Sequence, residues 1–108
     1  MSLPQLDPEQ RRKALEKAAE ARRVRAELKQ MLKTGEVTLS EVLDRATSAE
    51  PLAKMRVSEV IEAMPNFGKV KTRRLMERLD ISASRRVRGL GARQRELLLQ
   101  EFGEQRRP

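Results

Sequence analysis

The opening third of the chain predicts one long helix that apolar side chains anchor only in part. Asp7 can cap its start, Pro8 fits the first helical position, and Gln10 completes an Asp-x-x-Gln capping box. No helix breaker follows until Gly35, so the helix should run from Pro8 to about Lys33. Large apolar residues recur at helical spacing only in its second half, at Val24, Leu28, Met31 and Leu32. We expect this half to pack on a core and the first half to protrude into solvent.

Two shorter apolar stripes follow in the middle of the chain. Thr38 and Glu41 form a second capping box, ahead of a helix whose buried side is Leu39, Val42, Leu43 and Ala46. A short turn is expected near Pro51–Lys54. A compact third helix should come next and end at Pro65, with its apolar positions at Val57, Val60, Ile61 and Met64.

The last third predicts two helices on either side of a turn rich in arginine and glycine. The first should run from about Lys69 to Leu79 and bury Val70, Leu75, Met76 and Leu79. The second should run from about Ala92 to Phe102 and bury Leu97, Leu98 and Phe102, with Gly103 able to cap its end.

These patterns together predict an all-α fold, because no segment shows the alternation of a strand. The expected organisation is a long N-terminal helix within residues 1–34, followed by a small helical bundle that forms a head over residues 35–103. A module of loop, helix, turn and helix occupies about residues 57–102 of that head. Residues 104–108 are expected to be a disordered tail.

Composition removes several functional classes. The chain has no His or Cys, so the usual zinc ligand sets and disulfides are missing, and no metal or cofactor is expected. No stretch is long and apolar enough to span a membrane, and no signal peptide is expected, because Met1 opens a polar, charged segment. The default expectation is a soluble cytoplasmic protein. The absence of a long exposed apolar stripe favours a monomer.

Charge points to a polyanion as the partner. The formal net charge is +8, and it is spread unevenly: +4 in residues 1–34, −3 in residues 35–64 and +7 in residues 65–108. A basic protein gains affinity for nucleic acid by releasing the cations condensed on phosphates. Only two aromatic residues are present, Phe67 and Phe102, and core packing is the expected role of Phe67. Proteins that bind single strands or RNA loops stack the bases on aromatic side chains, and this chain has few of them. Duplex DNA is therefore the expected ligand.

The sharpest local motif is the junction Pro65–Lys71, which reads Pro-Asn-Phe-Gly-Lys-Val-Lys. Gly68 lets the backbone approach an anion closely, and the first N–H groups of the following helix would point at that anion. Lys69 and Lys71 put positive charge at the positive end of the helix, which a purely structural helix would avoid. A bound phosphate would remove this conflict. The alternative is an ordinary Pro-Gly turn with solvated lysines.

A second candidate is the segment Arg85-Arg86-Val87-Arg88-Gly89-Leu90-Gly91. Arginine donates in a planar fork that fits phosphate, and the glycines free the backbone. The alternative is a solvated basic turn. Both descriptions hold if Val87 and Leu90 fix a loop that presents the arginines. A weaker group is expected either to make secondary DNA contacts or to be solvated, namely Arg22, Arg23, Arg73, Arg74 and Arg93; Arg78 is expected to be solvated.

The module resembles the helix-two-turn-helix element of formamidopyrimidine-type DNA glycosylases and of a small-subunit ribosomal protein. Over residues 1–103 the chain is similar to the actinobacterial integration host factor family. The residues that carry this resemblance are Leu3-Pro4-Gln5-Leu6, Glu9-Gln10-Arg11, Ala14–Ala18, Ala21-Arg22-Arg23, Lys54-Met55, Val57-Ser58, Gly68–Lys71 and Ser84–Gly91.

The resemblance implies a nucleoid-associated protein that binds duplex DNA with little sequence preference. It also implies that the protein bends or compacts DNA and assists phage integration alongside a site-specific recombinase. The DNA-contacting positions of the family carry over here to Pro65, Gly68, Lys69, Val70 and Lys71, and to Arg85, Arg86, Arg88 and Gly89.

Three other functions compete with DNA binding. A glycosylase or lyase would need a catalytic amine and a pocket for a flipped base, which so short a chain has no room to build, so no enzyme is expected. A ribosome-associated or structured-RNA protein would use the same module on an RNA backbone. A helical adaptor protein would bind other proteins through its first helix, but that helix lacks the apolar heptad repeat of a coiled coil.

Overall fold

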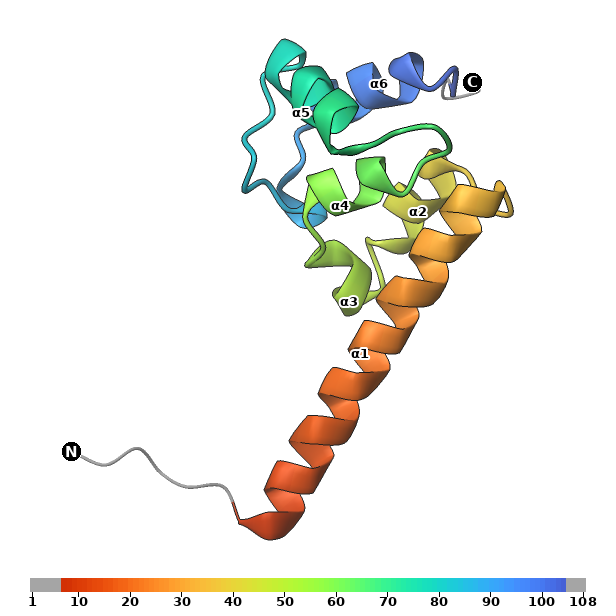
Figure 1. Cartoon of the computed structure of the whole chain (residues 1–108). Coiled ribbons are helices and arrows are strands. Elements are labelled where there is room, and N and C mark those ends of the chain that lie inside the picture. Colours follow the sequence, from red (N-terminus) through yellow and green to blue (C-terminus); the bar gives the residue numbers. More distant parts are fainter. Residues whose placement is uncertain (1–6, 105–108) are drawn as a thin grey trace, which may run out of the picture.

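A computed structural model describes residues 7–104, which form helices joined by turns and loops, with one isolated β-bridge and no strand in that range. The elements are α1 (Pro8–Thr34), α2 (Leu39–Arg45), α3 (Glu50–Ala53), α4 (Val57–Glu62), α5 (Lys69–Arg78), the 3-10 helix η1 (Val87–Gly89) and α6 (Ala92–Glu101). Figure 1 shows α1 as a rod that leaves a head formed by the other helices. The all-α prediction, with its long first helix, is confirmed.

Helix α1 begins and ends with the expected local chemistry. The Gln10 amide donates to the Asp7 carboxylate at 2.7 Å, and the Asp7 amide donates to the Gln10 side chain at 3.3 Å, which completes the capping box. Gly35 ends the helix in the left-handed region, with φ of 81°, where glycine meets no Cβ penalty. At ~1.5 Å per residue the helix is about 40 Å long.

The two halves of α1 have different surroundings. Every residue from 7 to 20 is exposed, and the buried side chains are Leu28 and Leu32, with Val24 and Met31 half-buried. Ion pairs such as Arg12–Glu16 at 3.2 Å support the exposed turns, each at about 0.3–0.5 kcal/mol. The head therefore holds α1 by its C-terminal half.

The core of the head lies between α1, α2, α4, α5 and α6. Its most deeply buried large side chains are Leu32, Leu39, Met55, Ile61, Leu98, Val42 and Val60. The predicted apolar faces of the second and third helices are buried as expected, apart from Met64, which is half-buried. In the part of the chain described, no helix is long and apolar enough to cross a membrane.

The expected turn near Pro51–Lys54 is instead the short helix α3. Pro51 occupies one of the first helical positions, where its missing N–H costs nothing, and Leu52 is buried. Pro51 therefore lies at the start of a helix, although its sequence context favours a turn. Helix α3 contacts both α1 and η1.

Val70 was expected in the core, but its side chain is 53% exposed. The buried positions of α5 are Thr72, Leu75 and Met76. At ~100° per residue, Val70 lies roughly 165° around the helix from the centre of that stripe. Sequence reasoning assigned Val70 by its hydrophobicity rather than by its helical register.

The C-terminal end of the head also differs from the prediction. Leu99 is buried along with Leu98, whereas Leu97 and Phe102 are half-buried. Glu104, expected in a disordered tail, accepts hydrogen bonds from the amides of Leu39 at 3.0 Å and Ser40 at 2.8 Å. It thereby caps α2 together with Thr38, whose hydroxyl accepts from the Glu41 amide at 3.1 Å. The rest of the predicted tail, residues 105–108, lies outside the described residues.

Candidate nucleic-acid interface

Helix α5 starts with a cluster of unused backbone donors. Gly68 is its N-cap, and no side chain within the described residues caps it. The first intrahelical bond of α5 runs from the Thr72 amide to the Gly68 carbonyl at 3.0 Å, so the amides of Lys69, Val70 and Lys71 have no helical acceptor. All three residues are exposed. This end of the helix is electropositive and open to an anion.

The glycine at this N-cap is not required by the backbone. Its φ of −111° and ψ of −175° are extended values that any residue adopts. No atom lies within 4 Å of a Cβ built at Gly68. Neither strain nor packing explains the glycine, and its effect is to keep the approach to the three amides unobstructed.

The loop ahead of α5 is fixed to the head by its aromatic side chain. The Phe67 and Phe102 rings pack with centroids 4.8 Å apart, as expected of a packing role for Phe67. The Lys71 ammonium donates to the Asn66 carbonyl at 3.3 Å and lies 5.8 Å from the centre of the Phe67 ring. Lys71 is therefore held over the loop, whereas the Lys69 side chain has no hydrogen bond or ion pair among the residues described.

The arginine segment is pinned to the connection between α3 and α4. The Val57 amide donates to the Arg85 carbonyl and the Val87 amide donates to the Met55 carbonyl, both at 2.9 Å. These two bonds make an isolated antiparallel bridge between Arg56 and Arg86. Val87 is buried, so the turn is fixed by backbone pairing as well as by its apolar side chain.

The three arginines of this turn have different partners. One Arg85 guanidinium nitrogen donates to the Gly89 carbonyl at 3.0 Å, and the residue is half-buried. The Arg86 guanidinium donates to the Lys54 carbonyl. Arg88 is exposed and makes no hydrogen bond or ion pair with any other described residue. Arg85 and Arg86 thus help to hold the turn, and Arg88 is free to meet a ligand.

The structure brings the predicted residues together as two groups. Arg85, Arg86, Arg88 and Gly89 line one surface hollow of about 270 Å³, along with Ser82 and Ser84, for which the sequence predicted no DNA contact. The other group, Pro65 and Gly68–Lys71, surrounds the start of α5. In residues 7–104, no hydrogen bond or ion pair joins the two groups. They are attached to opposite ends of α4.

The weaker candidates are spread over three helices. Arg22 on α1 and Arg73 and Arg74 on α5 are exposed, with no side-chain partner in the described part of the chain. Arg23 is bound by Glu20 and Glu27, and the pKa of Arg23 is raised by its hydrogen bond to Glu20 and by the charges of both carboxylates. Arg93 pairs with Glu96 at 3.3 Å.

Arg78 is not simply solvated, as was expected of it. Its two terminal nitrogens donate to the two carboxylate oxygens of Glu101 at 3.1 and 2.7 Å, and this pair joins α5 to α6. The Arg78 guanidinium lowers the pKa of Glu101, and Glu101 raises the pKa of Arg78, in each case chiefly through the hydrogen bond. Its partner lies 23 residues further along the chain, a distance that no local pattern reveals.

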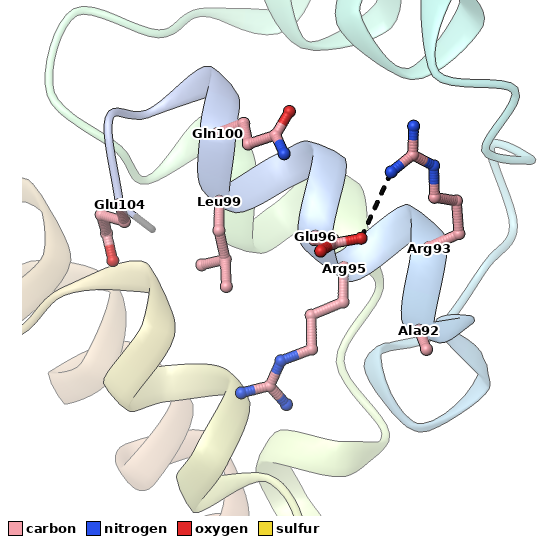
Figure 2. A pocket seen from close by; sticks show the side chains of 7 residues that line it. All are labelled: Ala92, Arg93, Arg95, Glu96, Leu99, Gln100 and Glu104. Carbon is pink, nitrogen blue, oxygen red and sulfur yellow. Dashed lines mark hydrogen bonds and ion pairs between the residues drawn. The ribbon is translucent and has the colours of Figure 1, made fainter. Parts of the chain in front are cut away.

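A larger hollow of about 480 Å³ beside α6 does not form a site of its own (Figure 2). Arg93 pairs with Glu96 across its rim, Arg95 pairs with Asp44 of α2, and Glu104 caps α2. Its charged side chains are therefore used within the protein. Nowhere in residues 7–104 do three or more His, Cys, Asp or Glu side chains come together in a way that would hold a metal ion.

The comparisons with known proteins agree with one another. A family model described as an S13-like H2TH domain matches residues 32–102. The chain is 57% identical over 103 residues to an integration host factor of Mycobacterium tuberculosis, a match that covers 95% of this chain and 98% of the relative. It is 52% identical over 103 residues to the integration host factor of Streptomyces coelicolor, covering 95% of this chain and 96% of the relative.

A solved structure gives the same result. The chain matches a structure described as sIHF bound to an 8bp palindromic DNA, with a TM-score of 0.80 and 50% sequence identity. The match covers 82% of this chain and 99% of the solved one. The relatives are 52–57% identical over nearly the whole chain and the domain model covers residues 32–102, so the chain belongs to the actinobacterial integration host factor family.

Proposed function

We propose that the protein binds duplex DNA through its phosphate backbone, with little sequence preference. The observation that carries the proposal is the start of α5, where three unused amides, two lysines and the positive end of the helix dipole coincide. Unbound, this arrangement is electrostatically unfavourable, and a phosphate makes it favourable. The contacts proposed here are Pro65, Gly68, Lys69, Val70 and Lys71, with Arg85, Arg86, Arg88 and Gly89.

The separation of the two groups suits a duplex. They are attached to opposite ends of α4, a helix of six residues, which at ~1.5 Å per residue is about 9 Å long. A duplex presents phosphates on both sides of each groove, so two separate phosphate-binding groups can be used on one ligand. Arg22, Arg23, Arg73, Arg74 and Arg93 are assigned secondary roles in this proposal.

Sequence-independent binding follows from the chemistry of these groups. Backbone amides and lysine or arginine side chains recognise phosphate oxygens, which carry no sequence information. The structure described as sIHF bound to DNA supports the ligand class, because its chain is 50% identical to this one. The proposed role is binding and not catalysis.

Several finer features belong to the same proposal. We propose that the protein bends or compacts DNA, resides in the nucleoid and assists phage integration beside a site-specific recombinase; the name shared by the relatives supports this role. Binding as a monomer is supported by the exposed large apolar side chains of residues 7–104, which are limited to Leu15 and Val70. The proposed functional unit is the head over residues 35–103, with the first half of the helix in residues 1–34 projecting from it.

A competition experiment tests the choice of ligand. Labelled duplex DNA bound to the protein is displaced with unlabelled duplex DNA or duplex RNA of the same length and sequence. We expect the DNA to compete at least several-fold better, because A-form RNA presents a differently shaped groove. Equal or better competition by RNA would favour the structured-RNA candidate, for which the same phosphate grip would serve.

A matched pair of lysine variants tests the α5 site itself. Lys69→Gln should weaken duplex binding about three- to five-fold at about 0.1 M salt, because one phosphate contact is lost. Lys33→Gln removes the same charge from an exposed position in the last turn of α1 and should change affinity by less than about 1.5-fold. Equal losses in the two variants would mean that the start of α5 is not a binding site.

A further inference from the structure

The β-bridge between the α3–α4 connection and the arginine turn places Arg56 and Arg86 side by side. The hydrogen bonds at Val57 and Val87 leave Arg56 and Arg86 as the pair that is not itself hydrogen-bonded. In this geometry the Cα atoms lie about 4.5 Å apart, and both side chains leave the bridge on the same side. Like charges directly opposite each other destabilise such a pair.

Among the residues that the structure describes, no group relieves this repulsion at Arg56. It is exposed, it is the N-cap of α4 without acting as a side-chain cap, and within residues 7–104 it has no ion pair or side-chain hydrogen bond. Arg86 differs, because its guanidinium donates to the Lys54 carbonyl. A purely structural bridge would gain by replacing Arg56 with a neutral or acidic residue, whereas an anion above the bridge would be bound by both arginines.

The next cation in the same connection is restrained by a carboxylate. The ammonium of Lys54, the C-cap of α3, lies 2.6 Å from a carboxylate oxygen of Glu50, the first residue of that helix. The pKa of Glu50 is below its ordinary value, because Lys54 hydrogen-bonds and attracts its carboxylate, with smaller contributions from the charges of Lys17 and Arg88. Glu50 is thus the acidic residue of a neighbourhood in which Lys17, Lys54 and Arg88 are positive.

The position of α3 links this neighbourhood to the arginine turn. α3 contacts η1, which carries Arg88, and the backbone of Lys54 holds the Arg86 guanidinium. Any ligand that meets Arg86 and Arg88 therefore lies against the connection between α3 and α4. Sequence reasoning gave residues 54–56 no functional role, because they belong to the acidic middle of the chain.

We propose that Lys54 and Arg56 are further phosphate-contacting residues, continuous with the arginine turn, and that Glu50 competes with DNA for Lys54 and so limits affinity. The inference rests on the proposed DNA-binding function. Arg56 meets the phosphate that lies over the bridge. Lys54 exchanges its carboxylate partner for a phosphate when the duplex binds, which leaves the Glu50 charge unpaired beside the DNA.

Opposite charge changes at Arg56 and Glu50 test the inference by fluorescence anisotropy with a labelled duplex of mixed sequence. At about 0.1 M salt, Arg56→Gln should weaken binding about five-fold and make the slope of log K against log salt shallower by about one. Glu50→Gln should strengthen binding about three-fold. In a Lys54→Gln background the gain from Glu50→Gln should fall below about 1.5-fold, because the restrained cation is gone.

Matched controls separate local contacts from the total charge of the protein. Arg45→Gln removes an exposed arginine of α2 that has no side-chain partner in the described residues, and Glu16→Gln breaks another exposed pair one turn apart, with Arg12. Each control should change affinity by less than about 1.5-fold. Thermal melting of every variant should stay within about 2 °C of the wild type, since only exposed groups change.

The outcomes are distinct for the two levels of the proposal. The inference would be overturned if Arg56→Gln changed duplex affinity no more than Arg45→Gln, or if Glu50→Gln changed it no more than Glu16→Gln. The proposed function would still stand in that case, because the wild-type protein would bind the duplex. If the effects of Glu50→Gln and Lys54→Gln on the free energy of duplex binding were additive, the proposed competition between Glu50 and DNA for Lys54 would be wrong. Failure of the wild-type protein to bind duplex at all would overturn the proposed function and the inference together.

Discussion

Arg85, Arg86 and Arg88 look equivalent in the sequence, and the structure separates them. Arg85 closes the turn on the Gly89 carbonyl and Arg86 joins the turn to Lys54, whereas the Arg88 side chain has no partner within residues 7–104. The sequence could predict that a basic turn exists, because three arginines precede two glycines. It could not predict the roles, since the partners at residues 54–57 lie some 30 positions earlier in the chain.

Single alanine substitutions should therefore have different effects. Arg88→Ala should weaken duplex binding about five-fold and leave the melting temperature within about 1 °C, because it removes a ligand contact only. Arg85→Ala should lower the melting temperature by about 2–4 °C, because a hydrogen bond that closes the turn contributes ~0.5 kcal/mol when exposed. Anisotropy titration and thermal melting of both variants would check this. Identical profiles for the two would contradict the division of roles.

At the scale of elements, local signals predicted the helices well wherever the apolar residues followed helical spacing and no residue also suggested a turn. Helix α1 is capped by Asp7 at its start and by Gly35 at its end, and the apolar stripe of α2 is buried as expected. The wrong predictions concern residues whose type is compatible with two different structural positions. Pro51 starts α3 instead of making a turn, and Val70 follows the register of α5 instead of its own hydrophobicity. The cap that Glu104 gives α2 spans 65 residues, which no local pattern encodes.

The Arg78–Glu101 pair gives α5 and α6 a stability term that depends on pH. Because the folded pKa of Glu101 is lowered, its contribution should be complete above the ordinary value of 4.5 and be lost as the pH falls through the lowered value. Glu101→Gln should lower the melting temperature by about 1–3 °C near neutral pH, since the pair is largely exposed. The difference should shrink below pH 4.5.

The control for this prediction is Glu96→Gln, which breaks the exposed pair with Arg93 inside a single helix. It joins no two elements, so its melting temperature should stay within about 1 °C of the wild type at every pH. A Glu101→Gln effect that persisted unchanged in acid would show that packing, and not the carboxylate charge, is responsible.

Helix α1 should behave as a rod that is held at one end. Deleting the chain through Arg12 should shift the melting temperature by less than about 2 °C, because residues 7–12 are exposed. Leu28→Ala, in the half that packs on the head, should cost about 2–4 kcal/mol as judged by denaturant unfolding. Unfolding caused by the truncation would contradict this picture of the helix.

At the scale of the whole molecule, composition and charge indicated a class of ligand and said little about shape. A net charge of +8, two aromatic residues and the absence of His and Cys were enough to favour a duplex-binding, metal-free helical protein. The placement of the charge was not predictable in detail. Residues 54–56 belong to a segment of net negative charge, yet the bridge brings Arg56 beside the most basic turn of the chain.

The central claim is that phosphates, and not bases, supply the binding energy. Its most direct test is the affinity for several unrelated duplexes of equal length, measured across a range of salt concentrations. With about five phosphates neutralised, log K should fall against log salt with a slope of about −4 to −5, and the duplexes should agree within a few-fold. A flat salt response, or a preference of about a thousand-fold for one sequence, would contradict the account.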